Sequence, residues 1–266
     1  MRVFEFTHAI VREPGRSVVE GLRGDPNAVP SYEGVRKEHE AYIAALRAAG
    51  LAVDVLPALE AYPDSMFVED PALVLPEGAI LLRPGAPSRV GERDEMRAAL
   101  ARHFERVLEL ENDDEYVDGG DVLVTPETVF IGLSKRTNRA GAEALKRKLA
   151  LLGRDARIVE TRGDILHLKT AVCLPDENAV LTTKAMAGSG IFAGFKTVLV
   201  ADGEDGAANS LRINDTVLVG ARFPKTIELL RKAGYTVVAL PVTEINKLDA
   251  GLSCMSLRWK KQGSDR

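Results

Sequence analysis

The pattern that decides the fold is a β-hairpin that recurs along the chain. FVEDPALVLPEGAILLRP (residues 67–84) and VDGGDVLVTPETVFIGLS (residues 117–134) each contain two apolar runs around a short turn. The pattern returns in LHLKTAVCLPDENAVLTT (residues 166–183) and AANSLRINDTVLVGA (residues 207–221). GLSCMSLRWK (residues 251–260) supplies half of a fifth hairpin, and its other half is the β-rich run at residues 2–12. The sequence therefore predicts five equivalent hairpins.

A helical stretch and a further strand follow each hairpin. The amphipathic pattern at residues 31–49 ends at Gly50 and precedes LAVDVLP (residues 51–57). Comparable segments follow the other hairpins, and the one ending in KTVLVAD (residues 196–202) is shorter. The repeating unit is ββαβ, and five such units favour a five-bladed α/β propeller in one domain, residues 1–266, closed by its N- and C-terminal strands. The alternative is two α/β halves that meet near residue 150.

Composition restricts the class of protein. The chain has 266 residues, of which 45% are hydrophobic and 28% charged, and a net charge of -4 with scattered Lys and Arg. This balance does not indicate nucleic-acid binding. No run of about 18 apolar residues and no signal peptide is visible, so we expect a cytoplasmic protein that does not enter a membrane. Two cysteines, Cys173 and Cys254, exclude a disulfide framework.

Polar residues stand at the start of each hairpin, where a propeller would bring them together at its axis. These residues are Glu69, Asp70, Asp118, Asp121, His167, Asn209 and Cys254. Cys254 lies among small residues after a turn, whereas Cys173 lies within an apolar strand and is predicted to fill the core. A nucleophilic thiol needs an acid or base partner, and a histidine needs a carboxylate to fix its tautomer. Cys254, His167 and Asp118 are the candidates for these three roles.

Acidic and basic side chains suggest the charge pattern of a ligand. PDSMFVED (residues 63–70) gathers Asp64, Glu69 and Asp70 in a strand-like context, where an inward carboxylate needs a cationic partner such as a guanidinium. Arg89 and Arg136 lie in loops and could hold a carboxylate through two hydrogen bonds. Acids at one end and arginines at the other match an amino acid with a cationic side chain.

The ordered set of motifs resembles the dimethylarginine dimethylaminohydrolase family of the pentein superfamily. The motifs are PDSMFVEDPA, the pair Ser88 and Arg89, DGGDVL, GLSKRTN, LHLKT, AANS and DAGLSCMSLR, in that order, and the resemblance as a whole covers residues 16–258. The resemblance implies a five-bladed propeller and hydrolysis of an Nω-methylated arginine to citrulline and dimethylamine or methylamine. It implies a covalent thiouronium intermediate on cysteine, and neither a metal nor an organic cofactor.

The resemblance also assigns roles to residues. Cys254 is similar to the nucleophile of the family, His167 to its general acid and base, and Asp118 to the acid that orients the histidine. The substrate-binding set implied by the resemblance comprises Leu22, Asp64, Phe67, Glu69, Asp70, Arg89, Arg136, Leu248 and Asp249. Arg89 and Arg136 resemble the pair that binds the α-carboxylate, and Leu22 and Leu248 would contact substrate through backbone carbonyls.

Two alternatives stay open. An arginine deiminase or amidinotransferase would share the fold, although the deiminases tend to carry an Arg-Asp pair where this chain has Glu69 and Asp70, and an acid at Lys169. A non-catalytic propeller that binds a partner is the alternative from another class, and Cys254 with His167 argues against it. The preferred methylarginine and the oligomeric state are left open, a homodimer included. The Gly- and Pro-containing loop after Arg16 is a candidate lid.

Overall fold

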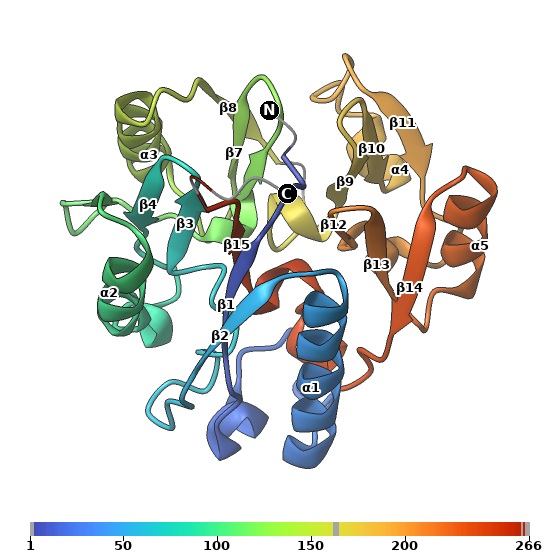
Figure 1. The fold of residues 1–266 in the computed structure, drawn as a ribbon, viewed down its shortest axis with the longest axis horizontal. Helices are drawn as coiled ribbons and strands as arrows, with labels where there is room; N and C mark the ends of the chain where they lie inside the picture. Colours follow the sequence, from blue (N-terminus) through green and yellow to red (C-terminus); the bar gives the residue numbers. More distant parts are fainter. Residues whose placement is uncertain (1–2, 162–164, 262, 264–266) are drawn as a thin grey trace.

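The computed structural model describes residues 3–161, 165–261 and 263, and arranges five three-stranded sheets around a central axis (Figure 1). The first sheet joins the two ends of the chain. In it, β15 (Leu257–Trp259) pairs antiparallel with β1 (His8–Arg12), which pairs in parallel with β2 (Ala52–Leu56). The pairing of the N- and C-terminal strands closes the ring, as the sequence predicts.

The other four sheets repeat the same topology. Within each sheet the first two strands form an antiparallel hairpin, and the third strand lies parallel to the second. The strands are, sheet by sheet, β3 (Ala72–Leu75), β4 (Gly78–Leu81) and β5 (Val107–Glu109); β6 (Val122–Val124), β7 (Val129–Leu133) and β8 (Ala156–Glu160); β9 (Val172–Asp176), β10 (Ala179–Thr182) and β11 (Lys196–Leu199); β12 (Leu211–Ile213), β13 (Thr216–Gly220) and β14 (Thr236–Leu240). The ββαβ repeat and the five-bladed α/β propeller are therefore confirmed.

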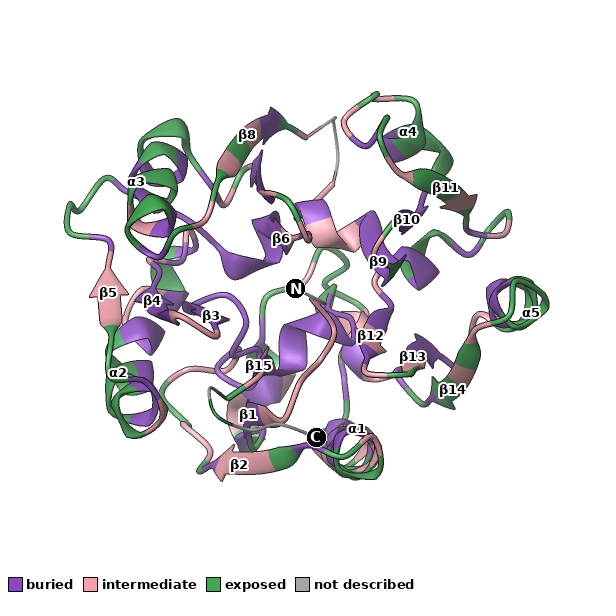
Figure 2. Ribbon diagram, turned by 45° about the horizontal axis from the view of Figure 1, so that its top comes forward, coloured by how far each residue is buried: buried purple, intermediate pink, exposed green. Residues whose placement is uncertain are grey.

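One helix crosses between the second and third strand of each unit and lies at the periphery. These helices are α1 (Tyr32–Ala48), α2 (Glu92–His103), α3 (Arg139–Leu151), α4 (Lys184–Ala187) and α5 (Pro224–Lys232). Figure 2 shows that they turn buried residues toward the sheets and exposed residues outward. The Ser31 hydroxyl accepts a hydrogen bond from the Gly34 amide and caps α1, which ends before Gly50 at a φ of +92°.

The N-terminal strand is shorter than the sequence predicts. It begins at His8 rather than near residue 2, which lies outside the described residues. Thr7 still bonds to Trp259 of β15 and Ala52 of β2, but the backbone before it bonds to a side chain, because Asn214 donates to the Phe6 carbonyl and accepts from the Phe6 amide. The Asn214 amide also donates to the Phe4 carbonyl. The β-rich composition of this segment thus serves packing of Phe4 and Phe6 rather than strand pairing.

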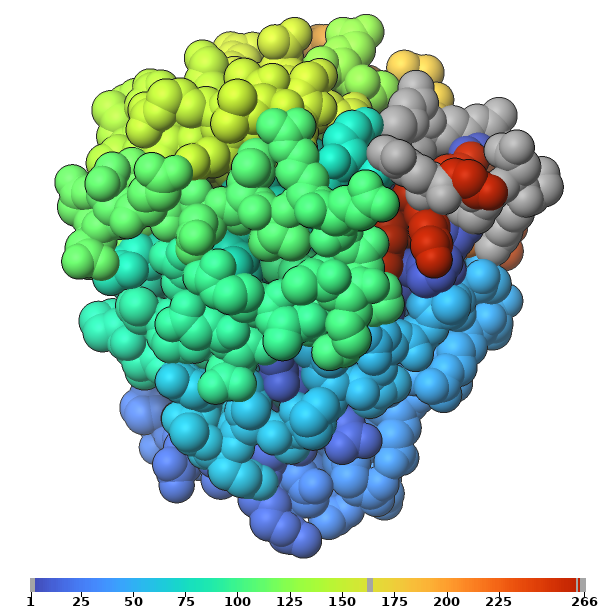
Figure 3. Space-filling view, turned by 60° about the vertical axis from the view of Figure 1, so that its left-hand side comes forward, coloured from blue at the N-terminus to red at the C-terminus, as the bar shows by residue number. Residues whose placement is uncertain are grey.

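Short 3-10 turns begin the hairpins near the axis and place the functional side chains. Such turns at Gly119–Asp121, Leu168–Thr170, Asp205–Ala208 and Ser253–Met255 precede the strands β6, β9, β12 and β15. The first contacts the second, and the second contacts the third. Figure 3 shows one face of the molecule, on which the colours pass from blue at the bottom through green to yellow-green at the top, with red C-terminal atoms beside blue N-terminal ones. Among the described helices, none is long and apolar enough to cross a bilayer.

Candidate active site

A cavity of about 240 Å³ opens at the axis between the starts of the blades. It is lined by Leu22, Arg23, Gly24, Asp64, Phe67, Asp70, Arg89, Arg136, Leu166, His167, Leu248, Asp249, Ala250 and Cys254. Ten of the twelve residues predicted for the site are therefore on its wall. The two others, Glu69 and Asp118, lie immediately behind it, in contact with residues of the wall.

His167 and Asp118 form a buried hydrogen-bonded pair. The Nε2 atom of His167 lies 2.8 Å from Oδ2 of Asp118, which is fully buried, and the Gly85 amide donates to Oδ1 of Asp118 at 2.7 Å. Because the carboxylate accepts, the proton on Nε2 is fixed and Nδ1 is the ring nitrogen left for chemistry. The structure thus brings Asp118 and His167 together, and the orienting role of Asp118 stays a prediction.

The acids around His167 hold it in its protonated form. Burial by itself lowers the pKa of this histidine, but the charge of Asp70, the hydrogen bond to Asp118 and the charges of Asp121 and Asp118 outweigh burial. Together these contacts raise the pKa of His167 to about 9. The side chain of His167 is therefore a doubly protonated, positively charged imidazolium at neutral pH and can act as a general acid.

The Gly119–Gly120 pair is required by close packing within the site. A Cβ atom at Gly120 would lie 2.6 Å from Nδ1 of His167, and one at Gly119 would lie 1.9 Å from the Glu69 carbonyl oxygen. The Gly120 amide also donates to Oδ1 of Asp70 at 3.1 Å. The pair lets the backbone approach the histidine ring directly, so a side chain at residue 120 would displace that ring.

Cys254 lies in the 3-10 turn before β15, and its side chain borders the cavity. The Gly251 amide donates to Sγ at 3.5 Å, and Nδ2 of Asn209 lies 3.8 Å from Sγ. Burial, followed by the charges of Glu69 and Asp70, raises the pKa of the thiol to about 12, against the Gly251 hydrogen bond and the charge of Lys169. In the empty cavity Cys254 is consequently a neutral thiol.

Two acids on the cavity wall are fixed in different ways. Asp70 forms an ion pair with Arg89, and although burial alone raises the pKa of Asp70, the charges of Arg89 and His167 lower it overall. Asp64 accepts from the Leu22 amide at 3.0 Å, and its burial raises its pKa despite the charge of Arg89. Asp70 is therefore the carboxylate that stays charged next to His167.

The two predicted arginines differ in how fully they are engaged. Arg89 donates through Nε and Nη2 to the Glu92 carboxylate at 2.9 and 2.7 Å, and to the Phe67 carbonyl at 3.0 Å. Arg136 has one ionic contact in the described part of the chain, 3.7 Å from Nη1 to Oδ2 of Asp118. Of the two guanidinium groups, that of Arg136 is the more available to an anionic ligand.

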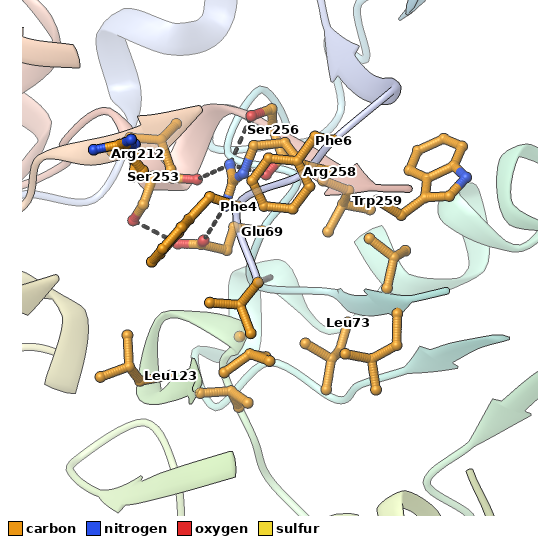
Figure 4. Close-up of a pocket in the computed structure, with 18 of the residues that line it drawn as sticks. Phe4, Phe6, Glu69, Leu73, Leu123, Arg212, Ser253, Ser256, Arg258 and Trp259 are labelled. Atoms are coloured by element: carbon orange, nitrogen blue, oxygen red, sulfur yellow. Dashed lines mark hydrogen bonds and ion pairs between the residues drawn. The ribbon is translucent and has the colours of Figure 1, made fainter. Parts of the chain in front are cut away.

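Glu69 faces away from the cavity that its neighbour Asp70 lines. Its Oε1 atom lies 2.6 Å from Nζ of Lys169 and 3.3 Å from Nη2 of Arg258, and its Oε2 accepts from the Ser253 hydroxyl at 2.9 Å (Figure 4). These residues line a second cavity, which shares no lining residue with the first. Glu69 keeps one contact with Cys254, because its amide donates to the Cys254 carbonyl at 3.2 Å.

Three residues support the site although the sequence assigns them no role in it. Asn209 accepts from the Ser253 amide at 3.1 Å and contacts Cys254, and Asp121 accepts from the Leu168 amide beside His167. The repeat places Asn209 and Asp121 at hairpin starts near the axis, but it does not show which side chains they contact. Lys169, two residues after His167, had no comparable signal for its bond to Glu69.

The loop after Arg16 is attached to the cavity at two points. The Leu22 amide bonds to Asp64, and the Gly24 amide donates to Oδ2 of Asp249 at 2.5 Å. Asp249 adopts a left-handed conformation with a φ of +53°, which is uncommon for a residue other than glycine. Leu22 is 38% exposed and borders the cavity, so it lies at the mouth. Motion of this loop as a lid stays a prediction.

One trio offers ligand atoms close enough for a metal ion. Atoms of Asp70, Asp118 and His167 lie within 4.8 Å of one another. Each already has another partner, because Asp118 bonds to His167 and Asp70 pairs with Arg89. Both carboxylates are therefore already engaged within the described residues, which fits a proton-transfer pair.

Comparison with known proteins agrees with this geometry. Residues 27–189 match the family model described as N,N dimethylarginine dimethylhydrolase, eukaryotic. The chain is 35% identical to N(G),N(G)-dimethylarginine dimethylaminohydrolase (DDAH) of Pseudomonas aeruginosa, over 96% of this chain and 100% of that protein. The chain belongs to the DDAH family. The DDAH of Streptomyces coelicolor is 33% identical, over 95% of this chain and 97% of its own length.

Solved structures extend the comparison. A cysteine-to-serine variant of P. aeruginosa DDAH complexed with citrulline has a TM-score of 0.92 at 35% identity, covering 96% of this chain and 100% of that chain. The N-terminal domain of ArgZ, a cyanobacterial arginine dihydrolase, has a TM-score of 0.85 at 20% identity, covering 97% and 98%, which shows a shared fold alone. The chain is thus a DDAH-like amidinohydrolase with the pentein propeller.

Proposed function

We propose that this DDAH-family hydrolase converts an Nω-methylated arginine to citrulline and dimethylamine or methylamine. The observation that carries the proposal is that Cys254, His167 with its carboxylate, and the acid Asp70 meet at one 240 Å³ cavity with Arg136 on the same wall. Membership of the family supports the choice of a methylated guanidinium as substrate.

The charges of the cavity orient such a substrate in one direction. The guanidinium carries a positive charge and is attracted to Asp70, whose lowered pKa keeps it ionised. The α-carboxylate accepts hydrogen bonds from Arg136, with Arg89 contributing from behind. Asp64 and the backbone at Leu22 and Leu248 remain for the amino end. Binding both ends fixes the guanidinium carbon near Cys254.

The thiol is activated by the substrate itself. In the empty cavity the pKa of Cys254 is raised to about 12 by burial and by the charges of Glu69 and Asp70. A bound guanidinium places a positive charge beside the sulfur, which favours the thiolate and releases its proton to water. The nucleophile is thus formed when substrate is present, which protects the free enzyme from unwanted alkylation and oxidation.

Bond exchange then follows with His167 as acid and afterwards as base. The thiolate forms an S–C bond to the guanidinium carbon, and Nδ1 of His167 donates its proton to the dimethylamine as the C–N bond breaks. An S-alkylthiouronium remains on Cys254. Neutral His167 next takes a proton from water, and the hydroxide adds to the same carbon. The S–C bond then breaks as the proton of the added hydroxyl passes to sulfur, which releases citrulline and returns Cys254 as the thiol.

The proposal is tested by product analysis with three substrates in parallel. Asymmetric dimethylarginine, monomethylarginine and arginine are incubated with the protein and with Cys254→Ser as a matched variant that removes only the nucleophilic sulfur. Release of citrulline with equimolar dimethylamine, lost in the variant, is the expected result. Turnover of arginine alone would reassign the chain to the deiminases, and turnover of none would remove the hydrolase proposal.

A further inference from the structure

A second cavity shares no lining residue with the cavity that Cys254 borders, and Figure 4 shows part of its wall. Its volume is about 150 Å³, and most of its exposed lining is apolar. The apolar wall includes Phe4, Phe6, Leu73, Leu123, Leu257 and Trp259. We name this space the axial cavity. A cavity of about this volume lined by aliphatic and aromatic side chains accommodates a single benzene ring.

One end of the axial cavity is polar and has an excess of positive charge. A single carboxylate there, Glu69, faces two cations, Lys169 at 2.6 Å and Arg258 at 3.3 Å. Nη1 of Arg258 donates to the carbonyls of Ser253 and Ser256, but its buried Nε has no hydrogen-bond partner among the described residues. An unpaired donor on a buried cation is costly, so this end is complementary to an anion.

The other charged residues that line the axial cavity do not neutralise its excess of positive charge. Lys260 lies 3.2 Å from Glu5, and Arg154 lies 2.7 Å from Glu77, so these two cations are balanced by carboxylates. Arg212 donates to the carbonyls of Pro175 and Asn214 and has no carboxylate partner within the part of the chain that is described. It adds a further positive charge to the lining.

We propose that the axial cavity is a ligand site distinct from the substrate cavity, and that it binds a compact aromatic carboxylate. The volume and the apolar wall favour a ligand with a single aromatic ring. The cluster of Glu69, Lys169 and Arg258 favours a negatively charged group at the polar end of the cavity. The cationic side chain of an arginine derivative does not fit, because it would be buried against an apolar wall beside two cations.

Residues that are adjacent in sequence line different cavities. Ser253 and Glu69 line the axial cavity, whereas the adjacent residues Cys254 and Asp70 line the substrate cavity. The axial cavity therefore has its own wall, so occupation of one site can be separated from occupation of the other by substitutions that touch a single wall.

The test uses phenylacetate as the probe and phenylacetamide as its neutral counterpart of nearly equal size. Both are titrated into the full-length protein by calorimetry or by ligand-observed NMR. We expect phenylacetate to bind roughly tenfold more tightly, the difference of one charge-assisted hydrogen bond. Equal affinity of the two probes, or no saturable binding of phenylacetate, would overturn the proposal.

Variants identify the cavity that is occupied. Leu123→Trp fills the axial cavity and should abolish binding, and Lys169→Met should remove most of the preference for the carboxylate. Arg136→Met changes only the substrate cavity and should leave binding unaltered. Loss of phenylacetate binding in Arg136→Met, or its retention in a folded Leu123→Trp, would place the probe elsewhere and refute the site. Thermal unfolding establishes that each variant is folded.

Discussion

Replacing Asp118 by asparagine tests how the histidine is controlled. The Gly85 amide donates to Oδ1 of Asp118, so the carbonyl oxygen of an asparagine at this residue will take that place and its NH2 group will face His167. An NH2 group cannot accept a hydrogen bond from Nε2, so it favours a neutral ring whose proton lies on Nδ1 and whose Nε2 accepts from the asparagine. In this tautomer Nδ1 cannot accept a proton from water. The same substitution in a serine-protease triad lowers kcat about 10⁴-fold.

The magnitude follows from the contacts of His167. Its pKa is raised to about 9 from a reference of 6.5, and two of the four contributions that raise it come from Asp118. At about 1.4 kcal/mol per pKa unit, the surrounding acids stabilise the imidazolium by on the order of 3 kcal/mol. We therefore expect Asp118→Asn to lower kcat by roughly 10³-fold or more and to move the basic limb of kcat/KM to lower pH by about one unit or more.

The assay is citrulline release from asymmetric dimethylarginine between pH 6 and 10. The control is Glu115→Gln, which alters another buried acid that accepts backbone hydrogen bonds, from Glu111 and Asn112, but lies outside the site. We expect the control to lose some stability and keep its kcat and pH profile. A loss of less than tenfold in Asp118→Asn, or an unchanged basic limb, would refute the role assigned to Asp118.

Three further predictions follow from the same contacts. Gly120→Ala should lower kcat by at least about tenfold without unfolding the protein, because its Cβ would meet Nδ1 of His167 at 2.6 Å; an unchanged kcat would show that the ring can move freely. Arg136→Met should raise KM for the amino acid substrate more than it lowers kcat, and a methylated guanidine without the α-carboxylate should not distinguish the variant from the parent. The pKa of His167 in the folded state lies above its reference value of 6.5. Its contribution to the free energy of unfolding is therefore complete below pH 6.5 and declines as the pH rises toward about 9. Chemical denaturation of the parent and of His167→Gln should show that the difference in their free energies of unfolding shrinks over that range.

Much of the fold could be predicted because local signals and the global repeat agree. Each hairpin has two apolar runs around a turn, and Ser31 and Gly50 mark the ends of α1 as capping residues do. The exception is the segment before His8, whose β-rich composition predicts a strand. Its backbone at Phe6 bonds instead to the side chain of Asn214, more than 200 residues away, and no local pattern reports such a partner.

The site was predictable in its location but not in the direction of every side chain. Hairpin starts meet at the axis, so Asp118, His167 and Cys254 could be grouped by their equivalent positions in the repeat. The short 3-10 turns there do not follow the two-residue alternation of a strand. Sequence therefore could not show that Asp70 lines the substrate cavity while Glu69 bonds to Lys169 at the axial cavity.

The central claim is that Cys254 carries the carbon of the substrate during turnover. We would mix the protein with asymmetric dimethylarginine, quench with acid at a series of times within one turnover, and analyse peptides by mass spectrometry. We expect the peptide containing Cys254 to gain the mass of the substrate minus dimethylamine, and the peptide containing Cys173 to gain nothing. Citrulline formation with no adduct on Cys254 at any quench time would contradict it.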